Sequence, residues 1–140
     1  DMRVEPFLLP TSVNLMMAQR LIPKLCQQCK KVETAPSEIQ KIIKKELEKL
    51  PQETTSNLQI YHSPGCKACK NKGVSGRIAI FEIFRMTPEL EEIINSDLTE
   101  HRILEEARRQ KMITLRQDGI LKALQGLVSI EVVLRETVEV

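Results

Sequence analysis

The sequence predicts an α+β fold in which a tetracysteine metal-binding module lies between two strands and a helical tail follows the second strand. Two strand-like segments, at about residues 14–22 and 77–84, flank the cysteine-rich region. Short capped helix patterns fill the chain after residue 87. Between the strands, two CxxC motifs are separated by 36 residues and supply four candidate metal ligands: Cys26, Cys29, Cys66 and Cys69.

Length, composition and charge limit the class of protein. The 140 residues suffice for one ordinary domain or two small units, and the hydrophobic share of 41% can form a core. The 21 basic and 19 acidic residues give a formal charge of +2, so any basic character must be local. No apolar segment is long enough to span a bilayer, and the first ten residues lack the features of a signal peptide. We therefore expect a soluble, cytosolic protein.

The N-terminal segment predicts a short helix and then a strand from about Asn14 to Ile22. Its three prolines, Pro6, Pro10 and Pro23, exclude one long helix. Residues 15–18 are apolar at every position, a pattern that fits a strand buried on both faces or a buried helix.

The region between the cysteine pairs predicts one amphipathic helix over residues 37–50, ending near Pro51. Its lysine-rich face is interpreted as a solvated surface, because glutamates are interspersed, although a basic interaction surface is the alternative. A polar loop at 52–57 and a short strand near 58–62 follow. Beyond the second cysteine pair, Gly73, Ser75 and Gly76 predict a turn into the strand 77–84.

Four helices are predicted in the tail from their capping residues. Thr87 precedes Pro88 at a helix start, and Thr99, Thr114 and Ser129 begin the next three. None presents enough apolar surface to be stable alone, so we expect the tail to pack on a neighbouring domain.

The cysteine spacing predicts a structural metal site. Two residues between thiolates allow one tight turn to direct both sulfurs to the same ion, and two such turns complete a tetrahedron with no position left for water or substrate. Reduced cytosolic thiols favour zinc, with mononuclear iron, a redox dithiol and disulfides as alternatives. His62 is interpreted as a strand-end residue near the site and His101 as exposed.

Six lysines lie close in sequence to the ligands and can neutralise the double negative charge of a divalent ion bound to four thiolates: Lys24, Lys30, Lys31, Lys67, Lys70 and Lys72. Tyr61 is the one aromatic residue between the cysteine pairs, which disfavours a nucleic-acid-binding zinc ribbon. No phosphate-binding loop of the GxxxxGK[ST] type occurs, and no catalytic constellation is found. Asp118 and the Glu105–Glu106 pair are interpreted as helix surface.

Three separated motifs give the chain a resemblance to a known family. The stretches VEPFLLPTSVNLMMAQRLIPKLCQQC, GCKACKNKGVSGRIAIFEIF and ARRQKMITLRQDGILKALQGLVSIEVVL resemble the C-terminal part of the type II secretion and type IV pilus assembly ATPases. The likeness covers essentially the whole chain. It departs from many members in the tail, where Val128 and Val132 replace a threonine and a glutamate, although Ser129 can still cap the last helix.

The resemblance implies a fragment of a larger motor with four parts. Residues 1–25 would be the end of a RecA-like motor domain, 26–72 the tetracysteine zinc module, 73–86 the return strand, and 87–140 a helical region. The two strands would be neighbours in the motor sheet. The family's zinc ligands fall on the four cysteines, whereas its ATP- and magnesium-binding motifs have no counterpart here and would lie upstream.

The function implied is that of a zinc-containing part of a hexameric cytoplasmic ATPase that drives type II secretion or type IV pilus assembly. One structural zinc is expected, with ATP and Mg²⁺ bound only by the full-length parent, so the chain alone should not hydrolyse ATP. Expected partners are the inner-membrane platform or other cytoplasmic components, with no insertion into the membrane. The alternative function is an autonomous zinc ribbon that binds nucleic acid.

Overall fold

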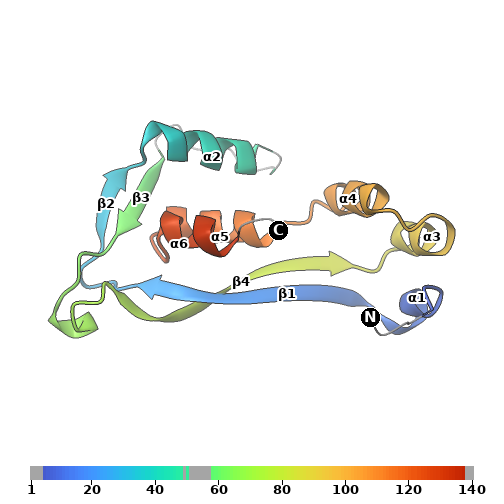
Figure 1. Ribbon diagram of the computed structural model, residues 1–140, viewed down its shortest axis with the longest axis horizontal. Helices are drawn as coiled ribbons and strands as arrows, with labels where there is room; N and C mark the ends of the chain where they lie inside the picture. The colour runs from blue at the N-terminus through green and yellow to red at the C-terminus, as the bar shows by residue number, and fades with distance from the viewer. Residues whose placement is uncertain (1–4, 49, 51–57, 138–140) are drawn as a thin grey trace. The chain divides into compact units, whose positions relative to one another are not determined.

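The computed structural model describes residues 5–48, 50 and 58–137. Helices and strands are mixed along the chain, which confirms the predicted α+β class. In chain order (Figure 1) the elements are α1 (Leu8–Ser12), β1 (Leu15–Leu25), β2 (Lys31–Thr34), α2 (Ser37–Leu47), β3 (Gln59–His62), the 3₁₀ turn η1 (Lys67–Cys69), β4 (Val74–Arg85), α3 (Pro88–Ser96), α4 (Glu100–Arg109), α5 (Leu115–Leu124) and α6 (Ile130–Glu136).

Two small antiparallel sheets organise the described part of the chain. β1 pairs with β4, so the two strands that flank the cysteine region are neighbours as predicted. β2 pairs with β3 in a register that runs from Lys31 opposite His62 to Thr34 opposite Gln59. The second sheet lies between the two cysteine motifs in sequence and therefore belongs to the insertion.

The chain forms two compact units, one from residues 1–18 and 82–113 and the other from residues 19–81 and 114–140. The first, here called the α3–α4 unit, contains α1, α3 and α4. The second, here called the cysteine unit, contains the second sheet, α2, the cysteines, α5 and α6. The functional boundaries predicted at residues 25, 72 and 86 stay predictions, because the two compact units divide the chain at other positions.

The strands are longer than their patterns predicted. β1 continues to Leu25 through Pro23, because a proline is accepted where a strand position needs no backbone donor. β4 already begins at Val74, so Gly76 lies inside the strand and not in a turn. Its φ of +77° is a conformation that glycine adopts without steric cost.

Two further details of the insertion differ from expectation. α2 ends at Leu47 and not near Pro51, and the predicted loop at 52–57 lies outside the described residues. Residue 50 precedes a proline and is therefore disfavoured in the helical conformation. β2 was not predicted at all, because its four residues, KVET, are too short to show a strand period and all four are exposed.

One hydrophobic core joins the insertion to the last two helices. It contains Ile22 and Ile80 from the long strands, Ile43 from α2, Ile60 from β3 and Ile120 from α5, each essentially inaccessible to water. Val128, Ile130 and Val133 extend it through α6. The predicted tail is therefore divided: α5 and α6 pack on the cysteine module itself, whereas α3 and α4 belong to the other unit.

The capping residues of the tail helices are largely as predicted. The side chain of Thr87 accepts a hydrogen bond from the Leu90 N–H, and that of Ser129 accepts from Val132 despite the two valine replacements. Thr114 forms a reciprocal capping box with Gln117. Thr99 precedes α4 but makes no side-chain cap.

Gly119 controls how closely α5 approaches α6. A Cβ at this position would lie 2.6 Å from Val133 Cγ1 and 3.2 Å from Cγ2. We expect Gly119→Ala to destabilise the chain by about 1–2 kcal/mol, because overpacking a filled core outweighs the gain in helix propensity. Chemical denaturation measures the loss. In the double variant with Val133→Ala the clash disappears, so the two changes should cost less together than the sum of their separate effects; simple additivity would contradict the contact.

Glu106 was predicted to lie on a helix surface, but its side chain is buried. Its side chain is 3% exposed at the end of α4 in the α3–α4 unit, while the neighbouring Glu105 is 58% exposed. The prediction for Glu106 was therefore wrong. The physical reason is a set of three donors. The Arg109 guanidinium and the Gln110 amide lie three and four residues further along the chain, and the Thr87 hydroxyl comes from just before α3, a contact that the local sequence did not reveal.

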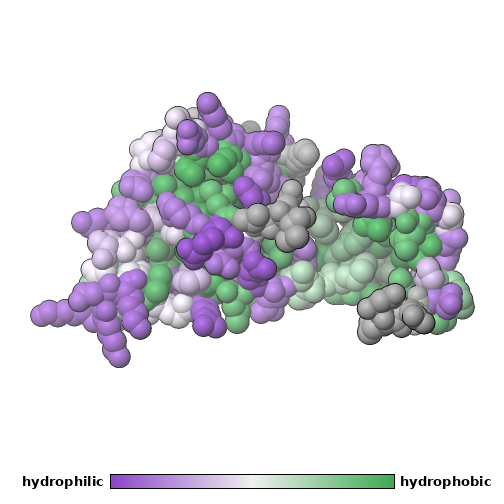
Figure 2. Space-filling model, viewed as in Figure 1, coloured by the Kyte–Doolittle hydropathy of each residue, from purple (hydrophilic) through white to green (hydrophobic). Residues whose placement is uncertain are grey.

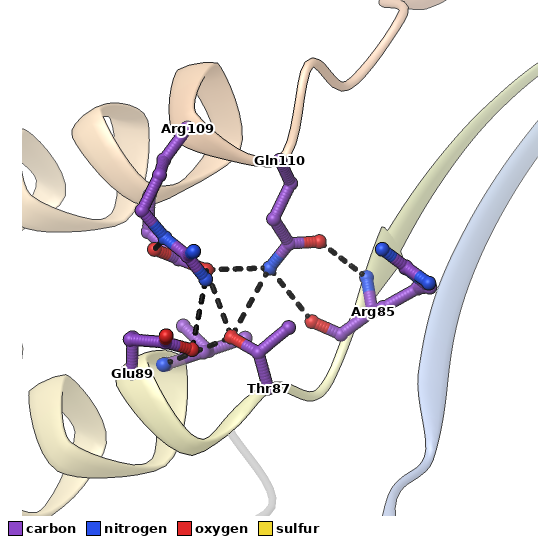
Figure 3. Close-up of polar contacts among 7 residues, drawn as sticks. Arg85, Thr87, Glu89, Arg109 and Gln110 are labelled. Atoms are coloured by element: carbon purple, nitrogen blue, oxygen red, sulfur yellow. Dashed lines mark hydrogen bonds and ion pairs between the residues drawn. The ribbon is translucent and has the colours of Figure 1, made fainter.

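Hydrogen bonds around Glu106 connect α3, α4 and the end of β4 (Figure 3). Glu106 Oε1 accepts from Thr87 Oγ1 at 2.8 Å and from Gln110 Nε2 at 2.8 Å, and Oε2 accepts from Arg109 Nε at 2.6 Å. Gln110 also accepts from the Arg85 N–H and donates to the Arg85 carbonyl. Arg109 pairs in addition with Glu89 at 2.8 Å. These contacts hold the pKa of Glu106 well below its ordinary 4.5, at about 2, with the Arg109 hydrogen bonds as the largest cause.

Candidate metal centre

The two CxxC motifs meet in the cysteine unit. The first follows β1, and the second occupies η1 immediately before β4 (Figure 1). Each cysteine offers one sulfur, and all four sulfurs lie within 4.8 Å of one another. The structure thus brings together every residue that the sequence proposed as a ligand, from segments 40 residues apart.

The distances between the sulfurs fit one tetrahedral ion. Cys26 and Cys66 are 3.9 Å apart, Cys29 and Cys69 4.0 Å, and Cys66 and Cys69 3.8 Å. Four thiolates at about 2.3 Å from a central zinc ion would be separated by about 3.8 Å. A disulfide requires about 2.05 Å, and all four cysteines are free. The donor set can therefore hold a metal ion, and its geometry is not that of two disulfides.

Backbone amides in the second turn are directed at Cys69. The N–H of Cys66 donates to Cys69 Sγ at 3.1 Å, and that of Gly73 donates at 3.3 Å. The turn is closed by the Asn71 N–H, which donates to the Cys66 carbonyl at 2.8 Å. Hydrogen-bond donors to sulfur stabilise the thiolate relative to the thiol, and the thiolate is the form that binds metal.

The environments of two thiols differ in their effect on protonation. The backbone N–H of Cys66, supported by that of Gly73, lowers the pKa of Cys69 to about 6. Burial raises the pKa of Cys29 to about 11. Cys29 therefore holds a proton at neutral pH that a metal ion would displace on binding.

The first turn is attached to the C-terminal end of α5. Gln27 Nε2 and Lys30 Nζ each donate to the Gly126 carbonyl at 3.3 Å. Lys30 Nζ also lies 5.2 Å from the centre of the Tyr61 ring. Gly126 has φ +69°, and a Cβ there would lie about 3 Å from both Tyr61 and Lys30, so only glycine allows this approach. The first cysteine turn is therefore in contact with the segment between α5 and α6.

Sequence reasoning did not find Gln27 and Gly126 as supports of the site. The two residues are 99 positions apart, and no local pattern relates them. His62 and His101 behave as predicted. His62 Nδ1 lies 3.5 Å from Glu33 of the neighbouring strand, His101 pairs with Glu105 on the surface of α4, and neither belongs to the sulfur cluster.

Comparison with known proteins identifies the class of protein to which this fold and site belong. The profile of the type II/IV secretion system protein family matches residues 1–135. The chain belongs to this family, as the resemblance in three motifs predicted.

Among its relatives, the type IV pilus assembly ATPase PilB of Pseudomonas aeruginosa is 41% identical over 137 residues. The type II secretion system ATPase E of Vibrio cholerae is 36% identical over 139 residues. These alignments cover 98% and 99% of this chain but only 23% and 26% of the two relatives. The chain thus spans about a quarter of the length of these relatives. Among the residues the structure describes, no helix is long and apolar enough to cross a membrane.

Proposed function

We propose that the chain is the zinc-containing C-terminal part of a cytoplasmic ATPase that powers type II secretion or type IV pilus assembly. The single observation that carries this proposal is the sulfur cluster, which lies inside a family match over nearly the whole chain. Cys26, Cys29, Cys66 and Cys69 bind one zinc ion. A tetrathiolate ion has no open coordination position and so acts in stability, not in catalysis.

Exposed apolar residues on β1 support the view that this piece works within a larger protein. Leu15, Met16 and Met17 are consecutive and are 49%, 42% and 54% exposed, so both faces of the strand present large apolar side chains. Residues 15–18 were predicted as part of a strand or helix buried on both sides. Within this chain residues 15–21 of β1 are exposed, and the strand is buried from Ile22 to its end only in part. The rest of the motor domain covers it in the proposed parent, which supplies the sites for ATP and Mg²⁺ and forms the hexamer.

The proposed role of the cysteine unit is to hold a rigid arm between two strands of the motor. Platform or other cytoplasmic components of the secretion or pilus machine contact this arm. The chain by itself does not hydrolyse ATP, since it lacks a phosphate-binding loop. Zinc ribbons that bind nucleic acid are the competing class, and a salt-dependent affinity for DNA or RNA would favour them.

Metal analysis tests the proposal directly. The purified chain should contain one zinc per molecule, and Co²⁺ substitution should give the absorption of a tetrahedral site with four sulfur ligands. Cys69→Ser should lose both, because it replaces a thiolate ligand, which two backbone N–H groups stabilise, with a hydroxyl that is not deprotonated at neutral pH. Ser75→Ala, at an exposed position beyond the second turn, is the matched control. A metal-free wild-type chain with native amide protection would contradict the proposal.

A further inference from the structure

The two cysteine turns differ in what holds them in place. The second turn is closed by its own backbone, because the N–H groups of Cys66 and Gly73 donate to Cys69 Sγ. The Asn71 N–H also donates to the Cys66 carbonyl at 2.8 Å. All of these donors and acceptors lie within residues 66–73, so this turn presents its two sulfurs without support from the rest of the chain.

The first turn has less internal support. Its backbone bonds run from the Lys30 and Cys29 N–H groups to the Cys26 carbonyl, at 3.0 and 3.4 Å. The backbone hydrogen bond to the sulfur of Cys29 comes from Gly65, beside the second cysteine pair. None of residues 26–30 belongs to the hydrophobic core that joins the insertion to the last two helices. Figure 2 shows hydrophilic side chains around the end of the cysteine unit where the turns lie in Figure 1. Polar contacts with other segments therefore hold this turn.

These polar contacts converge on the segment between α5 and α6. Gln27 Nε2 and Lys30 Nζ both donate to the Gly126 carbonyl. The Leu25 N–H donates to the following carbonyl, that of Leu127, at 2.9 Å. Gly126 has φ +69°, the left-handed conformation that is common just after the last turn of a helix. Three donors at or beside the first turn thus reach two neighbouring carbonyls at the end of α5.

We propose that the segment between α5 and α6 keeps the first turn closed on the metal, with Gln27 and Lys30 as positioning residues. This inference rests on the proposed zinc site and adds the order in which that site opens. Because the second turn is held by its own backbone, the first turn, with Cys26 and Cys29, leaves the ion first. Binding of the ion and packing of the two helices are then linked, so each strengthens the other.

The rate of zinc release tests this proposal. The zinc-loaded chain is mixed with an excess of a chromophoric chelator, and release is followed by absorbance. Q27A/K30M lacks both side-chain donors to Gly126 and should release zinc about 10-fold faster than the wild type, since residues that orient ligands commonly have effects of this size. Its Co²⁺ spectrum should still be that of four sulfur ligands. Lys30→Arg keeps a donor and should release zinc as slowly as the wild type.

The matched control, Q28A/K31M, makes the same chemical changes one residue further along the chain. The side chains of Gln28 and Lys31 are exposed and make no hydrogen bond or ion pair within the described part of the chain. Its release rate should stay within about twofold of the wild type. Equal acceleration in both double variants would overturn the proposal, because loss of positive charge near the thiolates would then be responsible. If Q27A/K30M does not fold, Q27A alone should release zinc about threefold faster.

Site-resolved alkylation gives the order of opening. Cys29 and Cys66 are both half-buried, so exposure alone does not separate them. A limiting amount of N-ethylmaleimide added to the zinc-loaded chain should first modify Cys29 or Cys26, as located by mass spectrometry. First modification at Cys66 or Cys69 would overturn the proposal. A wild-type chain without zinc would contradict the proposed function itself, whereas a zinc-loaded wild type that releases its ion as fast as Q27A/K30M would contradict only the positioning role.

Discussion

Removal of the metal from the loaded chain is expected to unfold the whole cysteine unit, including α5 and α6. Hydrogen exchange should show loss of amide protection in β3, in the cysteine-proximal part of β4 (residues 74–81) and in both C-terminal helices once a chelator has removed the ion. The effect should be large, because structural zinc supplies on the order of 10–16 kcal/mol in small zinc peptides. This is as large as the total stability of about 5–15 kcal/mol that is usual for a domain.

The shared core gives the reason that unfolding should extend beyond the cysteine turns. Ile60 of the insertion, Ile80 of β4 and Ile120 of α5 lie in one cluster. Hydrogen bonds connect the same segments, since the side chains of Gln27 and Lys30 in the first cysteine turn donate to the C-terminal end of α5. If the cysteine turns lose their metal ion, α5 and α6 lose apolar contacts with the insertion and the polar contacts of the first turn.

The α3–α4 unit is the internal control for this experiment. It contains no cysteine, and its hydrogen bonds around Glu106 come from its own residues. Protection in α3 and α4 should persist after chelation. Loss confined to the two cysteine turns would contradict a shared core, and loss throughout the chain would contradict two separate compact units.

The sequence was most informative where the chemistry is local. Two residues between cysteines are enough to predict a common metal site, and a threonine before Pro88 is enough to predict a helix start, because each signal concerns atoms within one turn. The flanking strands were predicted from the same kind of local pattern. The pairing of β1 with β4 was inferred from the family resemblance and not from the residues themselves.

Contacts between distant segments were beyond the reach of such patterns. β2 is too short to show a period and exists as a strand through its pairing with β3. The attachment of Gln27 to Gly126 and the burial of Glu106 both depend on partners from other elements. A glutamate in a run of charged residues is ordinarily helix surface. Glu106 is an interior residue because Thr87, just before α3, donates to it together with Arg109 and Gln110.

Glu106→Gln should destabilise the α3–α4 unit by up to about 3 kcal/mol at neutral pH. The change places an amide N–H₂ among donors that now point at a carboxylate, and it removes the charge that Arg109 contacts. The expected size follows from the pKa, which is about 2 in the folded chain and ordinarily 4.5, since each unit corresponds to 1.36 kcal/mol. Urea unfolding followed through amide signals of α3 and α4 measures the loss.

The pH dependence of unfolding distinguishes the contribution of the Glu106 charge from that of side-chain packing. Because folding lowers the pKa of Glu106, its stabilisation is complete above the ordinary value of 4.5 and disappears as pH falls toward about 2. The wild-type unit should therefore lose stability in that interval, and Glu106→Gln, which has no proton to gain, should lose much less. Glu105→Gln makes the same chemical change at the exposed neighbour and should cost less than about 0.5 kcal/mol. Equal losses of stability in the two variants would mean that the hydrogen bonds to Glu106 add little. If Glu106→Gln lost as much stability as the wild type between pH 4.5 and pH 2, the charge of Glu106 would not be what stabilises the junction of α3, α4 and β4.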